Sequence, residues 1–285
     1  MTQGYRNTHT PKTLYDAYRN LTVELPDQQL LYFVDIREYR NYGLPNSEYS
    51  CVAGVKAYEK LARAIAKDGK KMGPYRYELT LLRRVAGPPP VEDSLPGWGG
   101  GVAGEKLIVN TTDVMRAFIG KGSPDEIELA LRLAVYYGLV RPSLGELQAY
   151  CNEYIGLDCS GFTGVFYGPP YRGKSSVAYR TLGQEVKTLE DIEQGCAIVF
   201  LKTNHISVID SVYRDYVVNG KKVAVECMVA EATAAKMEME DPNDGLNYSS
   251  YTILKKPKGW DVTRRIIKGE ELKDTNPTVT IRKLA

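Results

Sequence analysis

The chain has 285 residues, of which 43% are hydrophobic and 25% are charged, and this balance excludes disorder as its dominant state. Basic residues barely outnumber acidic residues (37 against 35) and are scattered along the chain, so we expect no nucleic-acid partner. The length favours one sizeable domain, or a principal domain with a smaller companion.

The first ten residues lack the apolar segment of a secretory signal, and no later stretch has the apolar length of a membrane span. We therefore expect a chain that is cytoplasmic as synthesised. The five cysteines form no CxxC pair, which favours reduced thiols over a disulfide framework. The two histidines and the scattered cysteines make no metal-binding pattern, so we expect neither a metal nor a cofactor.

A small α+β unit is predicted at the start of the chain. Residues 30–36 and 75–85 have the composition of strands, whereas residues 51–67 carry apolar side chains at helical spacing. Glycine and proline then accumulate between residues 87 and 101, which is typical of a linker. We therefore divide the chain into an N-terminal α+β unit of unknown role (1–90), a linker and lead-in (91–122) and a principal domain (123–285).

Three helices are predicted at the start of the principal domain. Ser123 is followed by Pro124, Asp125 and Glu126, which is a capping box with proline at the first helical position, and this helix should end near Gly138. Residues 143–146 repeat the capping pattern and begin a second helix. The third helix should cover 159–167 and end at the following Gly-Pro-Pro sequence.

Strands are predicted after the helices, at 197–201, 205–212 and 223–232. Asn219-Gly220 is a strong hairpin signal between the last two strands. Helices followed by antiparallel strands indicate an α+β fold.

The tetrapeptide Asp158-Cys159-Ser160-Gly161 places a thiol at the start of the third helix. Asp158 is a natural N-cap, and the free N–H groups and the helix dipole at this end favour a thiolate. The same N–H groups could hold the oxyanion that forms when a thiolate adds to a carbonyl. Gly161 should let the helix pack closely on its neighbours. The alternative interpretation is a buried cysteine that packs as a small apolar side chain.

A nucleophilic cysteine needs a base, and His205 is the candidate because the other histidine, His9, lies in the polar N-terminal tail. The alternative is a histidine satisfied within the core. A third group should orient the imidazole, and Glu231 is our candidate because an unpaired carboxylate in its apolar strand would be costly. Glu226, from the same strand, is the alternative to Glu231.

Strand register provides a check on Glu231. If the loop at Asn219-Gly220 has two residues, His205 pairs with Ala234 and Glu231 points to the opposite face. An odd loop or one β-bulge would bring both side chains to one face.

Four segments of the sequence resemble the NlpC-type cysteine peptidases, papain-like endopeptidases of bacterial cell-wall peptides: DCSGF (158–162), GCAIVF (195–200), HISV (205–208) and AEA (230–232). The resemblance covers about residues 123–233. It implies a papain-like core, in which a helix carrying the nucleophile packs on an antiparallel sheet. It also implies that Ser160, and Tyr150 or Tyr154 in place of an upstream tyrosine of the family, contact the substrate or its acyl oxygen.

The sequence therefore predicts a cysteine amidase or endopeptidase with an acyl-enzyme, and the resemblance implies peptidoglycan stem peptides as substrates. An acyltransferase with the same acyl-enzyme, and a non-catalytic binding or assembly protein, stay open as alternatives. A cell-wall substrate requires delivery by a phage particle or a secretion device, or else a cytosolic recycling role. The expected partners are a peptide or peptidoglycan fragment, and a carrier or inhibitor protein that the N-terminal unit or the tail (241–285) could recognise.

Overall fold

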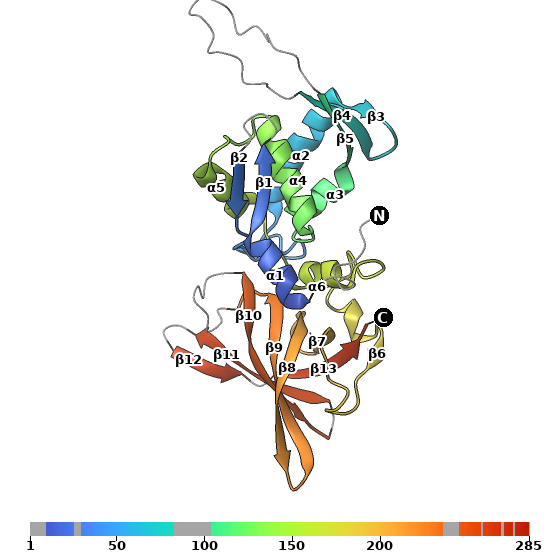
Figure 1. The fold of residues 1–285 in the computed structure, drawn as a ribbon, viewed down its shortest axis with the longest axis vertical. Helices are drawn as coiled ribbons and strands as arrows, with labels where there is room; N and C mark the ends of the chain where they lie inside the picture. Colours follow the sequence, from blue (N-terminus) through green and yellow to red (C-terminus); the bar gives the residue numbers. More distant parts are fainter. Residues whose placement is uncertain are drawn as a thin grey trace, which may run out of the picture.

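The computed structural model describes residues 10–25, 30–82, 104–235, 245–257, 259–268, 271–275 and 277–284. Helices and short strands form one half of the protein, and a β-barrel forms the other half (Figure 1). The α+β class predicted from the sequence is confirmed. Across the described ranges, no helix is both long and apolar enough to cross a membrane.

The helical half contains two small antiparallel sheets. One pairs β1 (Leu21–Leu25) with β2 (Leu30–Val34), and the other has the order β3 (Lys70–Lys71), β4 (Arg76–Leu82), β5 (Gly104–Asn110). Its helices, in chain order, are α1 (Pro11–Arg19), α2 (Val52–Asp68), α3 (Thr111–Phe118), α4 (Pro124–Tyr136), α5 (Leu144–Tyr154) and α6 (Cys159–Tyr167).

The last three helices begin where the capping residues predicted. The side chains of Ser123, Ser143 and Asp158 each accept a hydrogen bond from the backbone N–H three residues further on, which satisfies a donor that the helix leaves free. At Ser123 the capping box is complete, because the carboxylate of Glu126 also accepts from the Ser123 N–H at 2.8 Å.

The other half is an antiparallel barrel of six strands, of which only β7 (Cys196–Phe200), β8 (Ile206–Val218) and β9 (Lys221–Ala232) were predicted from the sequence. The strand order is β12-β11-β10-β9-β8-β7-β13-β6, and an additional pairing of β11 with β13 closes the barrel. The other three strands of the barrel are β10 (Leu246–Lys255), β11 (Trp260–Lys268) and β13 (Thr278–Lys283), while β6 (Gln184–Glu185) and β12 (Glu271–Thr275) each pair with one barrel strand from outside the ring. The long β8–β9 hairpin projects from the end of the barrel that lies away from the helices (Figure 1).

The two faces of the barrel strands belong to different hydrophobic clusters. Side chains such as Phe200, Val229 and Trp260 fill the interior of the barrel. Val208 and Ala230, which point the other way, belong to the cluster that contains the helices, and α6 contacts β8 and β9 directly. The start of α6 is thereby held against the barrel.

Contacts cross the predicted boundary between residues 1–90 and the principal domain. Strand β4 pairs with β5 along its whole length, although the predicted linker lies between them; residues 83–103 are outside the described part of the chain. Helix α1 contacts β8, β9 and β10 (Figure 1), and the Lys12 N–H donates to the Asp210 carboxylate at 2.9 Å. The Tyr18 hydroxyl donates to the carbonyl of Gly122 at 2.8 Å.

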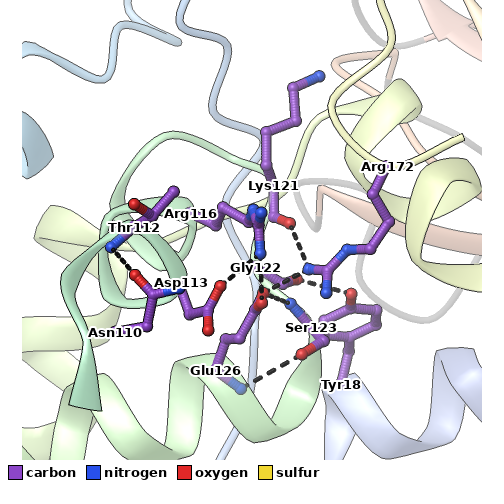
Figure 2. A network of polar contacts seen from close by, with 10 residues as sticks. All are labelled: Tyr18, Asn110, Thr112, Asp113, Arg116, Lys121, Gly122, Ser123, Glu126 and Arg172. Atoms are coloured by element: carbon purple, nitrogen blue, oxygen red, sulfur yellow. Dashed lines mark hydrogen bonds and ion pairs between the residues drawn. The ribbon is translucent and has the colours of Figure 1, made fainter. Parts of the chain in front are cut away.

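A buried carboxylate, Glu126, ties three segments of the helical half together (Figure 2). It accepts a hydrogen bond from Arg116 of α3 at 3.0 Å and another from Arg172, which follows α6. Arg172 also donates to the carbonyl of Lys121 at 3.4 Å, while the side chain of Lys121 points away from Glu126 (Figure 2). This network fixes the loop 119–123, which carries Lys121 toward the start of α6.

Candidate active site

Cys159 is the first residue of α6, and Lys121 binds Asp158, the N-cap residue that precedes it. Asp158 accepts hydrogen bonds from the Gly161 N–H at 2.5 Å and from the Ser160 hydroxyl at 3.0 Å. Lys121 binds the same carboxylate at 2.6 Å and also donates to the Ser160 hydroxyl at 2.5 Å. Ser160, which was predicted to contact substrate, is therefore buried and bonded to the pair formed by Asp158 and Lys121.

Helix α6 can lie against the loop 119–123 because residues 120 and 161 have no side chains. A Cβ atom on Gly161 would lie 2.0 Å from the carbonyl oxygen of Gly120, which no real structure tolerates. Gly120 itself has a φ of +79°, and a Cβ there would lie 2.4 Å from the carbonyl oxygen of Arg40. The predicted close packing at Gly161 is confirmed.

The β8–β9 hairpin brings Glu231 to the face that carries His205. Next to the turn, Val218 pairs with Lys221, as a two-residue loop requires. Three register irregularities follow along the hairpin, and their net shift is one residue, so that Val208 pairs with Ala230 rather than with Glu231. The parity problem that the sequence raised is solved by bulges and not by an odd loop.

The side chains of Cys159, His205 and Glu231 influence one another. The Nε2 atom of His205 lies 2.5 Å from Oε2 of Glu231, and Cys159 lies near enough to the imidazole to raise its pKa. Because Nε2 is engaged by Glu231, Nδ1 is the ring nitrogen left for the thiol. Glu226, the alternative third residue, pairs instead with Arg214 at 3.2 Å.

Charges around the imidazole favour its protonated form. Burial alone would lower the pKa of His205, but the negative charge of Glu231, together with hydrogen bonding of the protonated ring to Cys159 and Glu231, raises it to about 9. Burial would likewise raise the pKa of Glu231, but the charge of His205 and its hydrogen bond, together with Arg264 and Tyr251, lower it to about 2. Glu231 and His205 are therefore both charged at neutral pH.

Backbone and side chains almost completely cover the thiol. Cys159 is 2% exposed, and its Sγ lies 3.7 Å from the carbonyl oxygen of Asn204. That carbonyl also accepts from the Ser176 hydroxyl at 2.9 Å, and Arg180 donates to the carbonyl of Leu201 at 2.9 Å. The loop 201–204 is thus fastened over Cys159.

Tyr39 is a site residue that the sequence analysis missed. Its hydroxyl lies near the Cys159 thiol and accepts from the Asn41 amide at 3.3 Å. Burial, together with the nearby charges of Cys159 and Asp158, raises the pKa of Tyr39, so its hydroxyl keeps its proton as a donor. The sequence held no periodic signal for it, because Tyr39 lies in an irregular segment whose neighbours Glu38 and Arg40 bond to the backbone of Leu157.

Tyr150 and Tyr154, which the resemblance offered as contacts of the acyl oxygen, form an aromatic pair. Both are on α5, with ring centroids 4.7 Å apart. The hydroxyl of Tyr150 is buried without a hydrogen-bond partner among the described residues. The carbonyl of Tyr154 instead faces Gly54 of α2, whose missing side chain leaves room for it.

No protein-family model matches this sequence, and no curated protein or solved structure matches it either. In the part of the chain that the structure describes, no three His, Cys, Asp or Glu side chains gather in a way that could hold a metal ion. The chemistry of the site is therefore inferred from its own geometry.

Proposed function

We propose that the protein is a cysteine amidase or endopeptidase of the NlpC type, with a papain-like core, which works through an acyl-enzyme. The proximity of Cys159, His205 and Glu231 carries this proposal, because a thiol, a base and a group that orients the base are what such chemistry requires. The position of the thiol at the start of α6 supports it, since the helix dipole there favours negative charge.

In the first step, the Cys159 thiolate, whose proton is held on Nδ1 of the charged His205 ring, attacks the carbonyl carbon of an amide. Glu231, on Nε2, holds the ring in position and stabilises the imidazolium. The oxyanion that forms is held by the Tyr39 hydroxyl and by the backbone N–H of Cys159, which has no acceptor among the described residues.

In the second step, Nδ1–H of His205 protonates the leaving nitrogen, the C–N bond breaks and a thioester remains on Cys159. A water molecule, deprotonated by the same imidazole, then attacks the thioester and releases the acid. The imidazolium of His205 and the thiolate of Cys159 are restored at the end of the cycle, so nothing other than the amide and water is consumed.

The proposed substrates are peptidoglycan stem peptides, on the resemblance of the four segments that include Cys159, His205 and Glu231. A substrate carbonyl can reach Sγ only after the Asn204 carbonyl has moved away, because the thiol is 2% exposed. We therefore expect binding of the peptide to displace the loop 201–204.

The direct test is incubation of the purified protein with muropeptides, followed by mass analysis of the products. We expect cleavage by the parent protein and by Cys51→Ala, and no cleavage by Cys159→Ala at unchanged thermal stability. Cys51 is a matched control because it is equally buried, at 3% exposure, and is not bonded to His205. Turnover that survives in Cys159→Ala would end the proposal.

The near-complete burial of Cys159 favours one competing function, a non-catalytic binding or assembly protein. Alkylation by iodoacetamide at neutral pH separates the two. Burial raises the pKa of the Cys51 thiol to about 12, so this residue sets the rate expected of a structural cysteine. Labelling of Cys159 at the rate of Cys51 would favour the non-catalytic function, whereas much faster labelling favours the enzyme even if muropeptides prove to be the wrong substrate.

A further inference from the structure

Arg264 is a buried cation that stands directly behind the third residue of the site. Strand alternation places it with Trp260 and Val262, whose side chains lie inside the barrel. Its side chain is 12% exposed, and its Nη1 atom lies 3.7 Å from Oε1 of Glu231. The same nitrogen donates to the Tyr251 hydroxyl at 3.3 Å, and that hydroxyl donates to Glu231 at 2.5 Å.

Arg264 also acts on His205 indirectly, through the aromatic ring of Phe200. The guanidinium carbon of Arg264 lies 4.7 Å from the ring centroid of Phe200, which is a cation–π distance. The Phe200 ring in turn packs against the His205 ring, with centroids 4.8 Å apart. Arg264 therefore contacts both of the side chains, Glu231 and Phe200, that fix the imidazole.

The charge of Arg264 changes which protonation state of the site is favoured. When Arg264 and Glu231 are both charged, their charges cancel. The buried site is then neutral if Cys159 and His205 hold one exchangeable proton between them, either as a thiol and a neutral imidazole or as a thiolate and an imidazolium. A site in which both hold a proton carries a net positive charge, which is costly to bury. Without Arg264 this order is reversed, and the doubly protonated state, in which the thiol cannot attack, becomes the neutral one.

The other groups that face this site do not cancel the effect. On the α6 side, Asp158 is paired with Lys121 at 2.6 Å, so the two add no net charge. Tyr39 and Tyr251 both have raised pKa values, because of burial first and of neighbouring negative charge second, and remain neutral phenols. Asn247, which donates to Glu231 at 3.1 Å, is uncharged.

We propose that Arg264 is a positioning residue that keeps the Cys159 and His205 pair in its reactive protonation state by balancing the charge of Glu231. This inference rests on the proposed function for its purpose, but its electrostatic content can be measured without any turnover. Arg264→Gln removes the charge, Arg264→Lys keeps it, and Arg214→Gln is the control, since it removes the arginine that pairs with Glu226 on the exposed hairpin.

The first measurement is the titration of the His205 ring by NMR. The chain has two histidines, so a His9→Gln background leaves one imidazole signal to follow. We expect Arg264→Gln to raise the His205 midpoint by about one pH unit, since a neighbouring positive charge has been lost. We expect Arg264→Lys and Arg214→Gln to leave the midpoint unchanged.

The second measurement is the rate of alkylation of Cys159 across a pH series. We expect the pH of half-maximal alkylation to rise in Arg264→Gln, and to return to the parent value in Arg264→Lys. A role limited to packing predicts the opposite, because a loosened site would expose the thiol, speed its alkylation and let the His205 midpoint fall toward about 6.5. That result would overturn the proposal.

If Arg264→Gln does not fold, Arg264→Lys carries the test alone. An unchanged midpoint supports the role of charge, and a midpoint near that of a free imidazole overturns it. A protein that shows the expected shifts and cleaves no peptide would retain this electrostatic role and lose the proposed enzymatic one.

Discussion

Glu231 keeps its charge at a position without solvent exposure because donors surround it on several sides. Its pKa is lowered, so the stability that depends on its charge is fully present above pH 4.5 and is lost as the pH falls toward 2. The pKa of His205 is raised, so its contribution is fully present below pH 6.5 and is lost as the pH rises toward 9. Both contributions to stability are therefore complete only between pH 4.5 and pH 6.5.

This window gives a prediction for Glu231→Gln. Removing the carboxylate should lower the free energy of unfolding by about 3 kcal/mol near pH 5.5, because it leaves His205 buried without its partner. The difference between the parent protein and the variant should shrink as the pH approaches 9, where His205 loses its proton in the parent. Urea denaturation at a series of pH values measures both quantities.

Glu226→Gln is the control for this measurement. Glu226 was the other candidate for the third residue, and its partner Arg214 has a side chain that is 61% exposed, so this pair should contribute little to stability. Its effect should be small at every pH tested. A difference for Glu231→Gln that is equally small, or that does not vary with pH, would contradict the charged pair.

The sequence indicates some residues of the site more clearly than others. Cys159 was marked by the cap before it and the glycine after it, and His205 by the scarcity of histidine in the chain. Glu231 could be suspected because a carboxylate in an apolar strand needs a partner. Tyr39 and Lys121 could not be found in this way, because each reaches the site from an irregular segment whose course depends on tertiary contacts.

At the scale of elements, α6 is positioned by a contact between backbones rather than between side chains. The Asp158 N–H donates to the carbonyl of Gly120 at 3.0 Å, and Gly161 packs against that same carbonyl. Because backbone cannot move away as a flexible side chain does, the helix has one allowed distance from the loop 119–123. Through Lys121, this distance also fixes the N-terminal end of the helix that carries Cys159.

We therefore predict that Gly161→Ala is strongly destabilising. Its Cβ atom would lie 2.0 Å from the Gly120 oxygen, and the shift needed to relieve this clash should cost about 3 kcal/mol or more. Gly145→Ala is the matched control, because it lies in the first turn of α5 with nothing within 4 Å of its added Cβ. That variant should be neutral or more stable by up to about 1 kcal/mol.

The denaturation midpoints of Gly161→Ala and Gly145→Ala test this predicted difference in stability. Equal stabilities would show that α6 does not approach the loop as closely as the structure has it. A large loss in Gly161→Ala, together with slower alkylation of Cys159, would show that the close approach also positions the thiol.

Element positions could be predicted from the sequence better than strand pairings. Caps, breakers and the Asn219-Gly220 turn are local signals, and they gave the starts of α4, α5 and α6 and the position of the hairpin turn. The β-bulges of β8 and β9, and the closure of β11 on β13, are decided by packing around the barrel. No local sequence pattern predicts them, so the sequence alone does not determine which face of the sheet Glu231 occupies.

At the scale of the whole molecule, one hydrophobic cluster runs through both halves. It includes Leu14 of α1, Leu61 of α2, Phe162 of α6 and Ala230 of β9. The glycine- and proline-rich stretch suggested a boundary, but a breaker-rich segment cannot show that the strands on either side of it pair with each other. We therefore expect residues on both sides of that stretch to unfold together.

Leu61→Ala tests this expectation, since Leu61 is fully buried and lies far along the chain from the barrel. Truncation should cost about 2–5 kcal/mol. In a Trp98→Phe background, fluorescence reports only Trp260 in the barrel interior, and we expect its unfolding midpoint to fall together with that of the helical circular dichroism signal. Lys60→Ala, an exposed neighbour on α2, should change neither midpoint. If Leu61→Ala shifts the helical signal and leaves that of Trp260 in place, the N-terminal unit and the barrel fold independently, as the division at residues 91–122 would require.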